Sequence, residues 1–119
     1  MSFDWAELVA LAERWDAQGP VDEATERAII SRAYYGAFNS ARTRLGARVS
    51  GNMSIHSQVI QAYKASNDKL ERTVGSWLDS LRRQRVRADY EADFGPRGAG
   101  KRALTEARKI LNKLSQCKR

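Results

Sequence analysis

The chain has very few of the residues that build disulfide, redox or metal sites. Its 119 residues include one cysteine, Cys117, and one histidine, His56. A single cysteine cannot form an intrachain disulfide, and one cysteine with one histidine cannot supply the ligand set of a zinc site. We therefore expect a reducing compartment, no bound metal and no cofactor.

Long apolar runs and secretion signals are also missing. No apolar stretch approaches the roughly 20 residues needed to span a bilayer. The N-terminus carries Asp4 and Glu7, where a signal peptide would carry lysine or arginine. These absences predict a cytoplasmic protein with no membrane association. The length predicts one domain with one core over residues 1–119.

Proline is scarce, and no stretch shows the alternation typical of strands. Pro20 and Pro96 each stand beside glycine at a predicted break. Apolar residues recur at helical spacing everywhere else, which predicts an all-α, up-and-down bundle of four to five helices. The expected helices cover about residues 3–18, 22–48 and 55–65, then a stretch from 69 towards the breaker at 95–100, then a basic C-terminal helix from about 101.

Local signals support several of these boundaries. Asp22 is a suitable N-cap for the second helix, and Asp68 followed by Glu71 resembles a capping box that opens the fourth. The second helix also carries small residues on one flank, which would let another helix approach closely. These are Ala33, Gly36, Ala37 and Ala41.

Positive charge exceeds negative charge, and the excess lies at one end of the sequence. The chain has 21 Lys/Arg, 14 Asp/Glu and a formal net charge of +7. Residues 97–119 hold eight of the basic residues and one acidic residue, so the charges of residues 1–96 cancel. This asymmetry is typical of binding to a polyanion, either nucleic acid or an acidic protein. A solvated basic face that aids solubility explains it equally well.

One arginine stands in the apolar register of the fourth predicted helix. Arg85 falls in phase with Leu81 and Ala88. A guanidinium at a core position is costly unless it is paired, and Asp89 lies one turn later on the same face. We expect a partly buried Arg85–Asp89 pair, with the Tyr90 hydroxyl able to reach a groove. The other arginines of this stretch should face solvent: Arg82, Arg83 and Arg87.

The second predicted helix carries a row of polar and aromatic side chains. Arg32, Tyr35, Asn39 and Arg42 recur at steps of three and four, so they share one face. Arginine and tyrosine suit phosphates and stacked bases. The alternative is a solvated face with tyrosines at a helix–helix seam.

Two stretches resemble the signature of the small single-domain HEPN family, a group of helical proteins that handle RNA. They are residues 31–38, SRAYYGAF, and residues 81–90, LRRQRVRADY. The resemblance covers most of the chain, from about Trp5 to Leu114. It implies a four- or five-helix bundle that forms a homodimer. It also implies RNA as a partner and a likeness to the toxin halves of HEPN–nucleotidyltransferase pairs and other prokaryotic defence modules.

The HEPN resemblance also implies roles for individual residues. Active HEPN ribonucleases carry an arginine followed four to six residues later by a histidine, and cleave RNA without a metal. Arg85 matches that arginine, but Tyr90 stands where the histidine is expected, as in a subgroup with an Arg-x-x-Ala-Asp-Tyr pattern. Arg85 would bind the scissile phosphate, Asp89 would orient it, and Tyr90 would donate a hydrogen bond or a proton. RNA would be guided in by Arg32, Tyr35, Arg82, Arg87, Lys101 and Arg102.

The missing histidine leaves two functions open. Tyrosine is a poor base at neutral pH because its ordinary pKa is about 10. The chain is therefore either a metal-independent endoribonuclease of toxin–antitoxin or defence type, or a non-catalytic binding subunit. In the second case the HEPN surface would dock a partner such as a nucleotidyltransferase.

His56 and the glycine-rich stretch at residues 95–102 each allow a functional and a purely structural interpretation. His56 is either a capping or surface residue, or a general acid or base that reaches Arg85. The stretch GPRGAGKR at residues 95–102 nearly spells a P-loop, but no strand precedes it and Arg102 stands at the hydroxyl position. It is either a linker or a helix N-terminus that holds an RNA phosphate with Arg97 and Lys101.

Overall fold

Five helices account for most of the chain, as the computed structural model shows over the residues that it describes, 3–46, 54–94 and 97–117. No strand occurs in these ranges, so the all-α prediction is confirmed. The helices are α1 (Ala6–Ala17), α2 (Glu23–Leu45), α3 (Ile55–Lys64), α4 (Lys69–Tyr90) and α5 (Ala99–Gln116).

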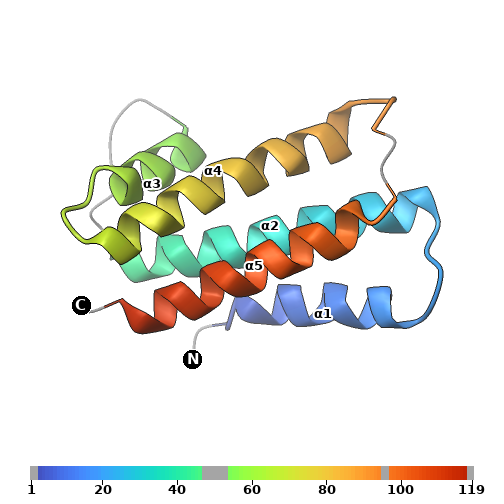
Figure 1. The fold of residues 1–119 in the computed structure, drawn as a ribbon, viewed down its shortest axis with the longest axis horizontal. Coiled ribbons are helices and arrows are strands. Elements are labelled where there is room, and N and C mark those ends of the chain that lie inside the picture. The colour runs from blue at the N-terminus through green and yellow to red at the C-terminus, as the bar shows by residue number, and fades with distance from the viewer. Residues whose placement is uncertain (1–2, 47–53, 95–96, 118–119) are drawn as a thin grey trace.

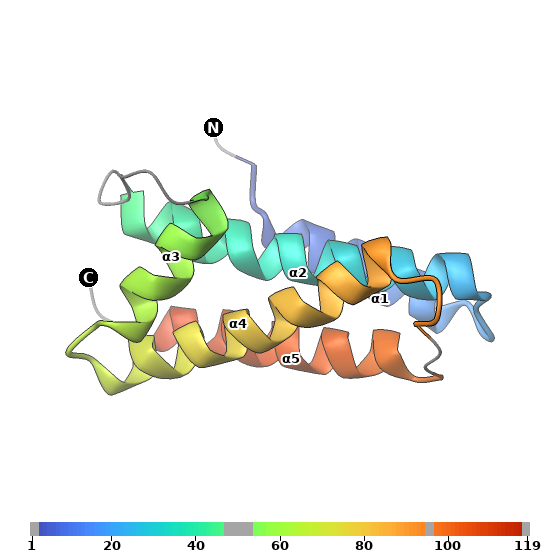
Figure 2. The ribbon, with the colours of Figure 1, turned by 90° about the horizontal axis from the view of Figure 1, so that it is seen from above.

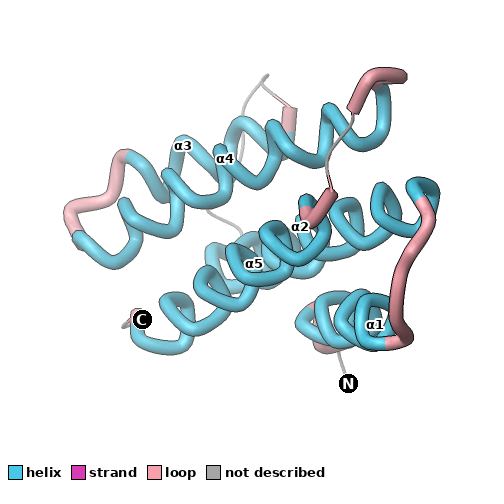
Figure 3. The backbone as a smooth tube through the Cα atoms, turned by 45° about the vertical axis from the view of Figure 1, so that its right-hand side comes forward, coloured by secondary structure: helices cyan, strands magenta, loops and turns pink. Residues whose placement is uncertain are grey.

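The helices form a bundle with α2 and α5 at its centre. In Figure 1, α1, α2, α4 and α5 lie along the long axis, and each runs opposite to the one before it. Figure 2 shows α3 crossing one end of the bundle, between the end of α2 and the start of α4. Figure 3 places α1 on one side of α2 and α5, with α3 and α4 on the other. Accordingly, α1 packs only on α2 and α5, whereas α3 packs on α4 and α2.

Side-chain caps and glycines set the ends of the helices. The Asp22 side chain accepts a hydrogen bond from the Thr25 N–H at 2.8 Å, which confirms the predicted N-cap of α2. α2 ends at Leu45, three residues before the expected end near residue 48. The next residue, Gly46, adopts a φ of +65° and so stops the helix. The loop predicted at residues 50–52 lies outside the described residues.

The capping box predicted for α4 is only half present. Asp68 does cap the helix, since its carboxylate accepts from the Leu70 N–H at 2.9 Å. Glu71 does not return to the Asp68 N–H, which donates to the Ser66 hydroxyl instead. Glu71 accepts from that hydroxyl at 2.6 Å and pairs with Arg44 at 2.8 Å. The Glu71 carboxylate therefore binds Arg44 of α2 instead of the backbone N–H of Asp68.

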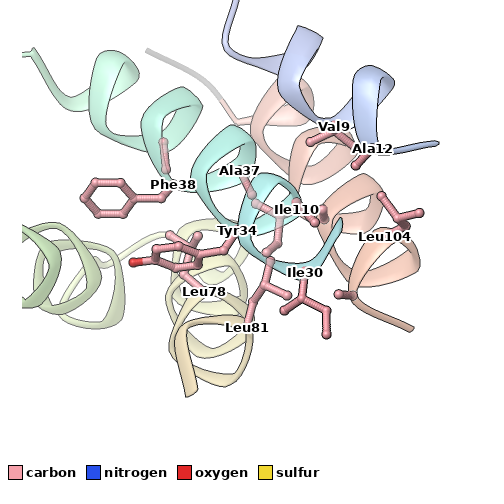
Figure 4. Packing of buried hydrophobic residues seen from close by; sticks show 14 of the residues in the cluster. Val9, Ala12, Ile30, Tyr34, Ala37, Phe38, Leu78, Leu81, Leu104 and Ile110 are labelled. Atoms are coloured by element: carbon pink, nitrogen blue, oxygen red, sulfur yellow. The ribbon is translucent and has the colours of Figure 1, made fainter. Parts of the chain in front are cut away.

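The core is a single apolar cluster to which every described helix contributes. Figure 4 shows how α2 supplies its centre, with Tyr34 and Phe38 projecting towards α3 and Ile30 facing α4 and α5. The α4 stripe expected from the sequence is buried throughout, including Arg85. No helix in the described ranges has the length and hydrophobicity to cross a membrane.

Two glycines allow neighbouring helices to come unusually close. A Cβ added to Gly36 of α2 would lie 2.6 Å from Val9 Cγ2, so the small flank of α2 does admit α1, as predicted. A Cβ added to Gly75 of α4 would lie 2.7 Å from the backbone nitrogen of Lys64, the last residue of α3. Gly75 therefore sets how closely α3 can dock on α4.

We predict that Gly75→Ala destabilises the fold. Alanine improves helix propensity by about 1 kcal/mol, but the contact is with backbone, so α3 must move, and overpacking typically costs about 1–3 kcal/mol. Chemical denaturation should show a net loss of free energy of unfolding, whereas Ser76→Ala at the neighbouring exposed position should show none. Equal stability of the two variants would refute this account.

Candidate functional site

Arg85 is the one charged side chain in the buried core of the described residues, and it is 7% exposed. Its guanidinium carbon lies 5.4 Å from the ring centre of Tyr34 and 5.3 Å from that of Tyr35. Nη1 donates to Asp89 Oδ2 at 3.2 Å, so the predicted ion pair is present. Arg85 lies on the buried face of α4, and there it contacts the rings of Tyr34 and Tyr35 from α2.

The aromatic rings are the main compensation for burying this cation. The Nε atom of Arg85 is buried and finds no hydrogen-bond partner among the described residues. Asp89 is reached by one long bond and is itself partly exposed. A desolvated guanidinium over an aromatic face gains about 2 kcal/mol or more, and here two rings share it. The guanidinium of Arg85 is therefore held in place while its Nε–H group remains without an acceptor among the described residues.

His56 joins the same group of rings from α3. Its imidazole stacks on Phe38 at 4.5 Å between ring centres and meets Tyr35 edge-on at 5.9 Å. Its Nδ1 lies 2.7 Å from the Tyr34 hydroxyl. The only histidine of the chain and the buried arginine therefore contact the same two tyrosines.

The hydrogen bond to Tyr34 determines which nitrogen of His56 carries the proton. Tyr34 is fully buried, and burial raises the pKa of its hydroxyl far above the usual range, so the group stays protonated. A buried hydroxyl needs an acceptor, and within the described chain the acceptor shown is His56 Nδ1. The neutral imidazole then carries its proton on Nε2 and presents that N–H as a donor.

The charged groups that act on His56 within the described part of the chain are arginines. Burial lowers the pKa of His56 below 6.5, and the positive charges of Arg82, Arg85 and Arg42 lower it further. Arg82 Nη1 lies 3.3 Å from the hydroxyl of Ser57, the next residue in α3. Arg42 is exposed and stands one turn beyond Phe38 on α2. At neutral pH the imidazole is therefore uncharged and lies in a positive potential.

The remaining predicted site residues lie elsewhere. Tyr90 is 76% exposed at the end of α4, and no hydrogen bond or ring contact links it to another described residue. Arg87 pairs with Glu91 at 3.3 Å. Arg32 is exposed on α2, one turn before Tyr35. The structure thus brings together Arg85, Asp89, Tyr35 and Arg82, and does not add Tyr90 or Arg87 to them.

The N-terminus of α5 already has an anion from within the chain. The Gly100 N–H donates to Glu26 Oε2 at 3.1 Å, and Lys101 pairs with Asp16 at 2.6 Å. Arg102 donates to the Arg97 carbonyl at 3.3 Å. An open cleft of about 860 Å³ lies here, but carboxylates contribute much of its lining. This end of α5 is therefore poorly suited to the RNA phosphate considered for Lys101 and Arg102.

Two of the five cations of α5, Lys101 and Arg108, pair with acids of α1. Arg108 forms two hydrogen bonds with Glu13, at 2.8 and 2.6 Å, and Lys101 pairs with Asp16. The sequence places the excess of positive charge at the C-terminal end, and within the described ranges Lys101 and Arg108 are the members of this group that pair with acids from residues 1–96. On the α2–α4 side, no ion pair in the described ranges involves the following arginines: Arg32, Arg42 and Arg82.

One group of potential metal ligands occurs in the described ranges. The ligand atoms of Asp68, Glu71 and Cys117 lie within 4.8 Å of one another. Glu71 is already bound by Arg44, and burial raises the pKa of the Cys117 thiol. A cation beside the carboxylate and a protonated thiol both oppose metal binding.

Tyr34, His56 and Phe38 were not among the residues assigned to the site from sequence. Tyr34 and Tyr35 precede Phe38 by four and by three residues, and both spacings place a side chain beside Phe38 on a helix. The sequence shows these spacings within α2, but it does not show that His56 of α3 packs against these rings.

Comparison of the chain with family models, with curated proteins and with solved structures found no match.

We predict that His56 titrates below pH 6.5, as an NMR titration of this single imidazole would show. Because the unfolded chain binds the proton more readily, the free energy of unfolding should fall as the pH drops from about 6.5 to the folded-state pKa. Removing a positive charge with Arg82→Gln should raise the pKa. Arg14→Gln, an exposed cation of α1, should leave it unchanged.

Proposed function

We propose that this chain is an RNA-binding protein of the HEPN type that receives the phosphate backbone where α2, α3 and α4 meet. The observation that carries this proposal is the convergence of Arg85 and His56 on the same two tyrosine rings. Arg42 and Arg82 stand beside them without an ion pair among the described residues. Cations and N–H donors that lack internal acceptors are the groups that bind phosphates.

The HEPN assignment is supported by the place where the two signature stretches meet. Tyr34 and Tyr35 belong to the first stretch and Arg85 to the second, and these three side chains are in direct contact. The alternating direction of α1, α2, α4 and α5 agrees with an up-and-down bundle (Figure 1). Residues about 50 positions apart thus contribute to one face.

The binding proposal is tested with a fluorescent single-stranded RNA and its salt dependence. Affinity should fall as salt rises, because bound phosphates release counterions. Arg42→Ala and Arg82→Ala should each weaken binding and reduce the slope of log K against log salt by about 0.7. Arg14→Ala removes an equal charge from α1 and serves as the matched control. An affinity independent of salt would point to a protein partner instead.

Metal-independent RNA cleavage is a second candidate, favoured specifically by the position of His56. In such a reaction the 2′-hydroxyl gives its proton to a water molecule, the 2′-oxygen attacks phosphorus, and the bond to the 5′-oxygen breaks. Once protonated, the imidazolium form of His56 can supply from Nε2 the proton that the leaving 5′-oxygen needs, so cleavage by this route should increase as the pH falls towards the pKa of His56. Arg85 would stabilise the charge that develops on the phosphorus oxygens. A histidine from α3 would then replace the one missing after Asp89.

Cleavage is tested by incubating the protein with an RNA pool in the presence of EDTA. The wild type should produce 2′,3′-cyclic phosphate and 5′-hydroxyl ends, and both His56→Gln and Arg85→Gln should abolish them. Arg83→Gln, at a position 72% exposed on α4, should retain activity. Intact RNA at high protein concentration, with binding unchanged, would leave the non-catalytic binding subunit as the function.

A further inference from the structure

We infer that Arg42, Arg82 and the Nε2–H edge of His56 form a site for a phosphate monoester, and that its ligand is the terminal phosphate of an RNA chain. We call these three groups the cationic rim. The inference rests on the proposed RNA binding and deepens it, because it specifies which part of the RNA occupies the site.

Contacts from three helices bring the rim together. His56 stacks on Phe38 of α2, and Arg42 stands one turn further along that helix. Arg82 of α4 reaches Ser57, the neighbour of His56 in α3, at 3.3 Å. The rim is therefore assembled by helix packing, and its two arginines approach the imidazole from different helices.

The charge of the rim matches a dianion better than a monoanion. Arg85 is balanced by Asp89, and His56 is neutral at pH 7. The nearby carboxylate of α4, Asp79, is already bound by Lys64 at 2.7 Å and by Arg83 at 2.8 Å. Arg42 and Arg82 then leave about two positive charges. A phosphate monoester carries about −1.5 to −2 at pH 7, whereas an internal phosphodiester carries one negative charge.

The hydrogen-bonding character of the rim points the same way. Two guanidinium groups and one imidazole N–H are all donors, and the oxygens of an ionised phosphate monoester are all acceptors. The N-terminus of α3 adds the positive end of a ten-residue helix beside His56. A phosphodiester offers only two free oxygens to these donors, so the fully ionised terminal group satisfies more of them.

The inference is tested with one RNA sequence of about ten nucleotides carrying a 5′-phosphate, a 3′-phosphate or hydroxyls at both ends. Binding is measured by fluorescence anisotropy at constant salt. A terminal phosphate should tighten binding about tenfold, which corresponds to one additional charge-assisted hydrogen bond. Arg42→Gln and Arg82→Gln should remove this gain, and Arg14→Gln should keep it. Arg42 is exposed, so its variant tests the rim without disturbing the core.

Each result has a distinct meaning. A gain from one end only supports the inference and identifies the end. Equal affinity for phosphorylated and hydroxyl RNA overturns the inference and leaves RNA binding in place. No affinity for any of the three RNAs overturns both. Inorganic phosphate is added as a competitor: displacement of the phosphorylated RNA down to the hydroxyl affinity supports a monoester site. Phosphate binding without any gain from terminal phosphates would mean a free-phosphate site and overturn the RNA assignment.

Discussion

A guanidinium held inside a helical bundle by two tyrosine rings is the interaction on which the site depends. Burying Arg85 without the rings of Tyr34 and Tyr35 would leave its charge with a single long bond to Asp89. The same Tyr34 that covers the arginine binds His56 through its hydroxyl. One aromatic side chain therefore couples the cation of α4 to the imidazole of α3.

The bundle geometry explains why this face is positive although most cations of the sequence lie elsewhere. α1 supplies carboxylates to Lys101 and Arg108 of α5 and so balances part of the charge of the basic C-terminal helix. It does not contact α3 or α4, so it contributes no acid to their side of the molecule. Arg32, Arg42 and Arg82 form no ion pair in the described ranges, and the nearby acids Asp79 and Asp89 are already bound.

The sequence predicted the helices and the buried pair but only part of the site. The periodicity of α4 identified Arg85 as inward-facing and Asp89 as its partner, because both features are local to one helix. The role of Glu71 was wrong because Arg44 comes from another helix. The contact of His56 with Tyr34 was not predicted, for the same reason. Which helices pack together depends on tertiary geometry, and residues 22 positions apart show no spacing signal.

The docking of α3 has a further consequence for how the site is maintained. α3 spans ten residues and is the one described helix that contributes an imidazole, which it places against rings belonging to α2. Its loss from the surface would dismantle the site while the remaining four helices keep their shared interfaces. Local undocking of this one short segment would therefore be sufficient to disassemble the site without global unfolding.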